Sequence, residues 1–218
     1  MNAPSFDDGD MTPSTAVLGV MFDFGGVLID WDPVPAVAHG VGEEEARRFF
    51  AEFDFAAWNH AQDAGRTWDE GLAELEGTHP HFLAHGRAYR AHFDHALIGE
   101  IPGTAQVLRD LHASGVPLFG LTNWSHELFH DHAPQRFDFL ALFEDIVVSG
   151  TEGLAKPDPA IYRLAIDRSG LTAEQLVFID DRAENVAAAE AAGMHGIHFT
   201  DADALRSALV ELGLLPGT

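Results

Sequence analysis

The chain has 218 residues, of which 46% are hydrophobic, and its 35 Asp and Glu against 12 Lys and Arg give a net charge of -23. This length suits one α/β domain with a smaller insert. The acidic surface argues against nucleic acid or an anionic membrane as a partner. Because the chain has no cysteine, it has no disulfide framework, thiol nucleophile or thiolate metal site.

Residues 1–15 (MNAPSFDDGDMTPST) are acidic and rich in turn-forming residues, and they lack the basic start and apolar middle of a secretory signal. We predict a flexible tail for this segment. No run approaches the 18 or so apolar residues that a membrane-spanning helix needs. These features predict a cytoplasmic protein whose partner is a small molecule.

A short apolar run at residues 17–22 (VLGVMF) predicts a buried strand that ends at Asp23, and a Gly-Gly turn follows it. Residues 33–98 differ in character, because Ala, Glu, His and aromatic residues recur there with helical spacing. The pattern Thr67-Trp-Asp-Glu70 is a capping box and marks a helix start. We therefore predict a small all-helical insert without strands of its own.

Beyond residue 101 the chain alternates between strands and helices, which predicts an α/β fold with a doubly wound parallel sheet. We assign residues 1–15 to the tail, 16–32 and 99–218 to the core domain, and 33–98 to a helical cap domain. The predicted strands are 116–121, 145–148, 176–179 and 195–199, and the predicted helices are 104–113, one from Ser125, 159–169, 184–192 and 202–212.

Polar residues follow the ends of several predicted strands. Asp23 follows the first strand, Thr122 and Asn123 follow the second, and Asp180 and Asp181 end a later one. In parallel sheets of this kind, ligands bind beyond the carboxyl ends of the strands. These side chains, together with a lysine at position 156 in the loop before a helix, are therefore predicted to meet in one crevice.

The same residues carry a resemblance to a known family. Residues 22–28 (FDFGGVL), Leu121-Thr122-Asn123, Lys156-Pro157 and residues 178–185 (FIDDRAEN) resemble, in order, the four motifs of haloacid dehalogenase superfamily hydrolases. The resemblance covers residues 17 to 214, and a helical insert after the first motif is typical of members with that type of cap. It implies the α/β core with a cap that the strand and helix pattern predicts independently.

The resemblance also implies a reaction: a magnesium-dependent phosphatase in which Asp23 attacks phosphorus and forms an aspartyl-phosphate that water hydrolyses. Mg²⁺ prefers oxygen ligands. The implied roles are catalysis by Asp23, Thr122 and Lys156, phosphoryl binding by Thr122, Asn123, Lys156 and Gly26, and Mg²⁺ binding by Asp23, the carbonyl of Gly25, Asp180 and Asp181. Arg182 has two readings, a phosphate contact or an exposed side chain, and Asn185 is either a supporting residue or an ordinary helix residue.

Gly25 departs from the family pattern. Most phosphatases of the family carry a second aspartate there, which protonates the leaving alcohol, and a glycine transfers no proton. Three explanations are open: a substrate with a good leaving group, a different acid such as Asp30 or a cap histidine (His60, His92 or His95), or loss of turnover. Glucose-1-phosphate-type phosphatases of the family share the Asp-x-Gly spelling and a later Asp-x-Asp like Asp30-Trp31-Asp32, which favours the first.

Two alternative functions follow. A 2-haloacid dehalogenase shares the fold and the Asp nucleophile, but it needs no metal, and the acid pair Asp180 and Asp181 favours a cation site. A non-catalytic binding protein with the same fold is consistent with Gly25. No motif in the sequence encodes the physiological substrate, which the cap loops set, or the oligomeric state.

Overall fold

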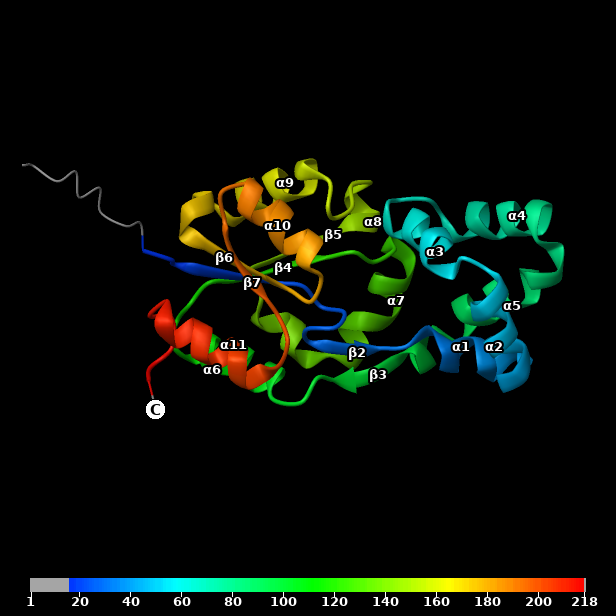
Figure 1. Ribbon diagram of the computed structural model, residues 1–218, viewed down its shortest axis with the longest axis horizontal. Helices are drawn as coiled ribbons and strands as arrows, with labels where there is room; N and C mark the ends of the chain where they lie inside the picture. Colours follow the sequence, from blue (N-terminus) through cyan, green and yellow to red (C-terminus); the bar gives the residue numbers. More distant parts are fainter. Residues whose placement is uncertain (1–15, 218) are drawn as a thin grey trace, which may run out of the picture.

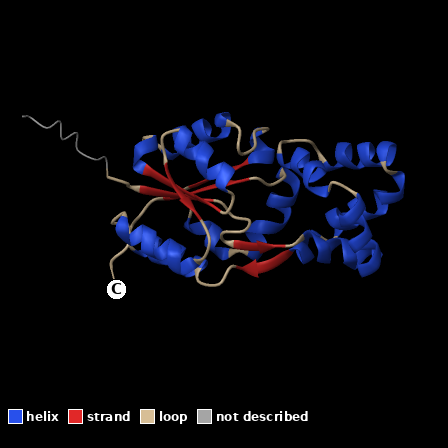
Figure 2. Ribbon diagram, viewed as in Figure 1, coloured by secondary structure: helices blue, strands red, loops and turns tan. Residues whose placement is uncertain are grey.

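The computed structural model describes residues 16–217, so the predicted tail lies outside the described residues. Its centre is a parallel sheet of five strands in the order β5-β4-β1-β6-β7. Helices lie on both sides of this sheet, whose strands are red in Figure 2. This arrangement confirms the predicted doubly wound α/β core. The strands are β1 (Gly19–Phe22), β4 (Leu118–Thr122), β5 (Asp145–Val148), β6 (Leu176–Asp180) and β7 (His195–His198).

Strand β1 lies in the middle of the sheet, where Val20 pairs with Leu118 of β4 and with Val177 of β6. Successive side chains of a strand point to opposite faces of the sheet. Because helices cover both faces of a parallel sheet, the side chains on both faces are apolar. Val20 and Phe22 pack with α6, α7 and α11 on one face, and Met21 packs with α9 and α10 on the other. The helices of this core are α6 (Thr104–Ala113), α7 (His126–Arg136), α8 (Ser149–Glu152), α9 (Pro159–Ser169), α10 (Ala183–Ala191) and α11 (Ala202–Glu211).

The α-helices between residues 33 and 91 gather at one end of the molecule, away from the C-terminus (Figure 1). We call them the cap helices; their division from the core as a separate domain stays a prediction. The predicted capping box is present, with the Thr67 side chain accepting from the Glu70 amide at the start of α4. Aromatic side chains form their core, including the fully buried Phe49 and Trp68. The cap helices are α1 (Pro33–Val41), α2 (Glu43–Glu52), α3 (Phe55–Asp63), α4 (Trp68–Thr78) and α5 (Leu83–Ala91).

Two short strands join the cap helices to the core: β2 (Ile29–Trp31) and β3 (Leu97–Glu100) form an antiparallel pair. The prediction of an insert without strands is therefore wrong at its end, because β3 begins inside residues 33–98. Each strand has only three or four residues, which is too short to show the alternation of apolar and polar residues that predicts a strand. Their pairing also joins residues far apart in the chain, so no local pattern indicates it. Within residues 16–217, none of the helices has the length and apolar character that crossing a membrane requires.

Candidate active site

The three predicted carboxylates converge at the carboxyl ends of two neighbouring strands. Asp23 follows β1, Asp180 ends β6, and the Asp23 amide donates to the carbonyl of Ile179 at 2.9 Å, which ties the two strand ends together. One oxygen each from Asp23, Asp180 and Asp181 lies within 4.8 Å of the others. Asp23 and Asp180 are buried, whereas Asp181 is exposed at the mouth of the cluster.

Lys156 lies inside this cluster and is almost completely buried. Its Nζ is 2.9 Å from Asp23 Oδ1 and 2.7 Å from Asp180 Oδ2. Asn123 fixes the loop that carries it, because the Asn123 amide group donates to the Lys156 carbonyl at 2.9 Å and accepts from the Lys156 amide at 2.8 Å. The structure thus brings the residue after β4 and the lysine loop into direct contact.

Asp180 has a fixed orientation. Asn185 Nδ2 lies 3.0 Å from both of its carboxylate oxygens, and the backbone amide of Arg182 donates to Oδ1 at 2.8 Å. Asn185 is therefore a buried partner of the cluster. The Arg182 side chain is 64% exposed and pairs with Glu184, so the structure favours the exposed side-chain reading.

Burial and neighbouring negative charge shift the pKa values of these carboxylates. Loss of solvent raises the pKa of Asp23 to about 7; Lys156 lowers it, and the Asp180 charge raises it. Burial and Asp180 also raise the pKa of Asp181. Three carboxylates face one ammonium group here, and the uncompensated negative charge suits a cation.

The two glycines after Asp23 have different surroundings. A Cβ on Gly26 would lie 2.5 Å from Asp181 Oδ2, and the residue has φ of 75°. The turn therefore packs directly against the carboxylate cluster and favours glycine. At Gly25, nothing lies within 4 Å of a Cβ position, so the site has open space where a side chain with an acid group would stand.

Thr122 is buried at the carboxyl end of β4, just before α7 begins. The cap helices contact this helix start, where the Trp68 indole donates to Ser125 Oγ at 3.0 Å. The N-terminal end of a helix attracts anions, which suits a phosphoryl group near Thr122 and Asn123. The predicted residues from four chain segments thus surround one end of the sheet.

The other candidates for a proton donor do not join this cluster. Asp30 on β2 and His60 on α3 are exposed. His92 and His95 stack against His39 of α1, with ring centroids 4.6 and 4.1 Å from that ring. Their contacts are with one another within the cap helices.

Asp63, at the end of α3, is a residue that the sequence does not single out as an acid. Burial raises its pKa to about 7, while the Ser125 backbone amide and the Asn59 side chain lower it. Its sequence signal is the stretch Asp63-Ala64-Gly65, which resembles the cap segment near the site in related proteins.

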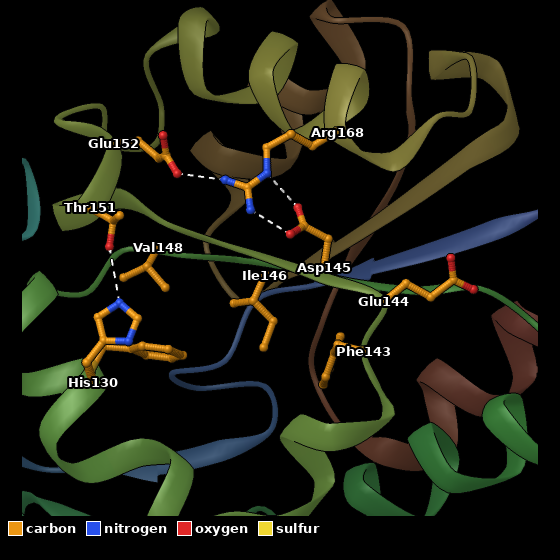
Figure 3. A pocket seen from close by; sticks show the side chains of 10 residues that line it. His130, Phe143, Glu144, Asp145, Ile146, Val148, Thr151, Glu152 and Arg168 are labelled. Carbon is orange, nitrogen blue, oxygen red and sulfur yellow. Dashed lines mark hydrogen bonds and ion pairs between the residues drawn. The ribbon is translucent and has the colours of Figure 1, made fainter.

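A separate cavity of about 410 Å³ lies beside the edge strand β5 (Figure 3). Arg168 crosses it and bonds both Asp145 and Glu152 at 2.7 Å. Among the described residues that line it, none belongs to the predicted site. Its guanidinium already pairs with two of the carboxylates that line the cavity, and the cavity lies apart from the carboxylate cluster.

Comparison with known proteins agrees with this fold. The family model of haloacid dehalogenase-like hydrolases matches residues 17–193. The chain therefore belongs to the haloacid dehalogenase-like hydrolase family. This match confirms the predicted superfamily and the prediction that the protein is an enzyme, a hydrolase of that superfamily.

Individual relatives extend the match. A phosphoglycolate phosphatase of Cereibacter sphaeroides is 30% identical over 84% of this chain and 85% of its own length. The sesquiterpene phosphatase astK of Aspergillus oryzae is 37% identical over 95 residues, 44% of this chain, and the match spans about half (48%) of that relative. A family enzyme of Bacteroides thetaiotaomicron, crystallised with magnesium and inorganic phosphate, superposes with a TM-score of 0.68 at 19% identity, covering 85% of this chain and 96% of that one.

Proposed function

We propose that this hydrolase is a magnesium-dependent phosphatase that releases phosphate from a small phosphorylated metabolite such as a sugar phosphate. The observation that carries the proposal is the cluster of Asp23, Asp180 and Asp181 around Lys156. The phosphatases among the relatives support the substrate class. The magnesium and phosphate in the Bacteroides enzyme support the cofactor.

In this proposal Asp23 is the nucleophile. Both of its short contacts, from Lys156 Nζ and from the Phe24 amide at 2.7 Å, use Oδ1, so Oδ2 is the oxygen that attacks phosphorus. The phosphoryl group moves to Asp23, and water then hydrolyses the aspartyl-phosphate. Lys156 balances the charge of the nucleophile and of the incoming phosphate.

The remaining residues bind and orient. We assign phosphoryl binding to the Thr122 hydroxyl, the Asn123 backbone amide, Lys156 and the Gly26 turn. The metal ligands in this proposal are Asp23, the Gly25 carbonyl and Asp181, with Asp180 completing the acidic set while it orients Lys156. Mg²⁺, when bound, supplies the positive charge that lets a carboxylate approach a phosphate dianion.

The test uses p-nitrophenyl phosphate with the wild-type protein, with Asp23→Asn and with Asp167→Asn, an exposed acid on α9, as the matched control. We expect turnover with Mg²⁺, its loss on adding EDTA, and a decrease of more than about 10³-fold in Asp23→Asn. The control should keep wild-type activity. Inert wild-type protein in the presence of Mg²⁺ would support the non-catalytic alternative.

The same chelator, EDTA, distinguishes the dehalogenase alternative from the phosphatase proposal. A 2-haloacid dehalogenase should release halide from 2-chloropropionate in EDTA, because its chemistry needs no cation. We expect no halide release under either condition. Halide release that survives EDTA, without phosphatase turnover, would replace the proposal by this alternative.

A further inference from the structure

Helix α7 begins with two histidines one turn apart, His126 and His130, in the sequence HELFH at residues 126–130. Residues four apart lie on the same face of a helix. A His-Glu-x-x-His sequence on a helix is typical of zinc sites in which both imidazoles bind the ion. The two rings are neighbours, with centroids 4.5 Å apart. Both side chains are exposed, so an ion can reach them from solvent.

One nitrogen of each ring faces the same oxygen of α8. His126 Nδ1 lies 2.9 Å from Thr151 Oγ1, and His130 Nε2 lies 3.5 Å from the same hydroxyl. Figure 3 shows the contact between His130 and Thr151 among the residues that line the cavity beside β5. Thr151 is exposed, so rotation of its side chain would leave the point where the two nitrogens converge to a cation.

The surroundings of the pair favour neutral imidazoles, the form that binds a metal. Partial burial lowers the pKa of His130, and the neighbouring His126 lowers it further, while Asp131 raises it. Within residues 16–217, no third His, Asp or Glu completes a three-ligand group with the two rings. Glu152, in the same cavity, pairs with Arg168. The protein therefore supplies two ligands, and water fills the remaining positions around the ion.

Glu127, the glutamate between the two histidines, distinguishes this pair from the centre of a zinc hydrolase. In metalloproteases with this motif the glutamate is the general base. Here Glu127 faces the cap helices, where it accepts from the Trp68 amide at 2.9 Å and from Arg90 at 2.7 Å. Because its carboxylate is held by these two donors, the pair is a binding site and not a second hydrolytic centre.

We propose that His126 and His130 form a binding site for a divalent transition-metal ion, with Zn²⁺ as the ion that suits two imidazoles. Imidazole nitrogen is a good ligand for Zn²⁺, whereas Mg²⁺ prefers oxygen, so the site is distinct in chemistry from the carboxylate cluster. The ion joins two successive turns of α7 and stabilises the helix that follows Thr122 and Asn123, because a ligand of the folded state alone stabilises that state. The site is independent of the proposed function.

The experiment titrates Zn²⁺ into the full chain by calorimetry, with Mg²⁺ in excess; any Zn²⁺ that the carboxylate cluster still binds is common to all variants. We expect His126→Gln and His130→Gln each to weaken binding at this site at least about tenfold, since even a residue that only supports a ligand is typically worth about 10–100-fold in metal affinity. His112→Gln removes an exposed histidine of α6. It is the matched control and should bind Zn²⁺ as wild type does.

A variant with altered spacing tests whether the two histidines bind one ion together. Asp131→His in the His130→Gln background keeps two imidazoles on α7, but the second no longer shares a face with His126, so Zn²⁺ affinity should not recover. Zn²⁺ should also raise the melting temperature of wild type more than that of His130→Gln. Equal Zn²⁺ affinity in wild type and both single variants, or recovery in the spacing variant, would overturn the site. Neither result depends on phosphatase turnover.

Discussion

Close packing at Gly26 shows how one residue shapes the carboxylate cluster. Its positive φ strains any other residue, and a Cβ there would collide with Asp181. Displacing a proposed ligand should weaken the site, since supporting residues of metal centres are typically worth 10–100-fold in affinity.

We therefore expect Gly26→Ala to weaken Mg²⁺ binding at least about tenfold, measured from the Mg²⁺ concentration that raises the melting temperature. Gly115 has the same φ of 75° but nothing within 4 Å of a Cβ, so Gly115→Ala is the matched control. Both variants should lose about 1–2 kcal/mol of stability from backbone strain. Equal Mg²⁺ affinity in the two would contradict the assigned site.

At the scale of elements, α7 carries contacts between the core and the cap helices. Glu127 in its first turn accepts from the Trp68 amide at 2.9 Å and from Arg90 at 2.7 Å. These contacts are partly buried, so losing one partner leaves a polar group without compensation. The helix thus links the end of β4, where Thr122 lies, to α4 and α5.

Glu127→Ala should lower the free energy of unfolding by about 1–3 kcal/mol, because it leaves the Trp68 amide and Arg90 Nη2 without this hydrogen-bond partner. The control is Asp69→Ala, which removes the other partner of Arg90, a side chain that is 88% exposed. Such an exposed pair should contribute less than about 1 kcal/mol. Urea denaturation of the two variants measures both free energies of unfolding. Equal losses of stability would show that the contacts of Glu127 on α7 contribute no more than the exposed ion pair.

At the scale of the whole molecule, Asp63 connects stability to pH. Its pKa is about 7 in the folded protein against 3.8 without the fold. Between these values the folded state binds the extra proton, so this group's contribution to stability is present at low pH and is lost as the pH rises towards 7.

The substitution Asp63→Asn removes the loss of stability that ionisation of Asp63 causes as the pH rises. We expect the variant to be more stable than wild type at pH 8 by about 1–3 kcal/mol, since one pKa unit corresponds to about 1.4 kcal/mol and partial exposure reduces the total. Near pH 4 the two proteins should be nearly equal. Denaturation curves at both pH values, with Glu76→Gln, which removes an exposed carboxyl of α4, as control, test this, and a variant less stable at pH 8 would refute it.

Much of the fold is predictable from local sequence. The apolar runs before Asp23 and Asp180, and the cap signals at Thr67 and Asp158, mark strands and helices whose bounds in the structure agree within a few residues. Such signals depend only on residues that are close in the sequence, so they can be recognised without knowing how the rest of the chain folds. The order of strand-end carboxylates likewise predicts one crevice, since parallel strands place their carboxyl ends together.

Tertiary structure alone decided three features. Pairing of β2 with β3, the double hydrogen bond that ties Asn123 to the backbone of Lys156, and the approach of Asp63 to the Ser125 amide all join residues far apart in the chain. The free energy of such contacts depends on how separate elements pack, and no local pattern records it. The sequence by itself determined the family's core and its acidic residues, whereas tertiary packing decided how the cap helices contact α7 and α8.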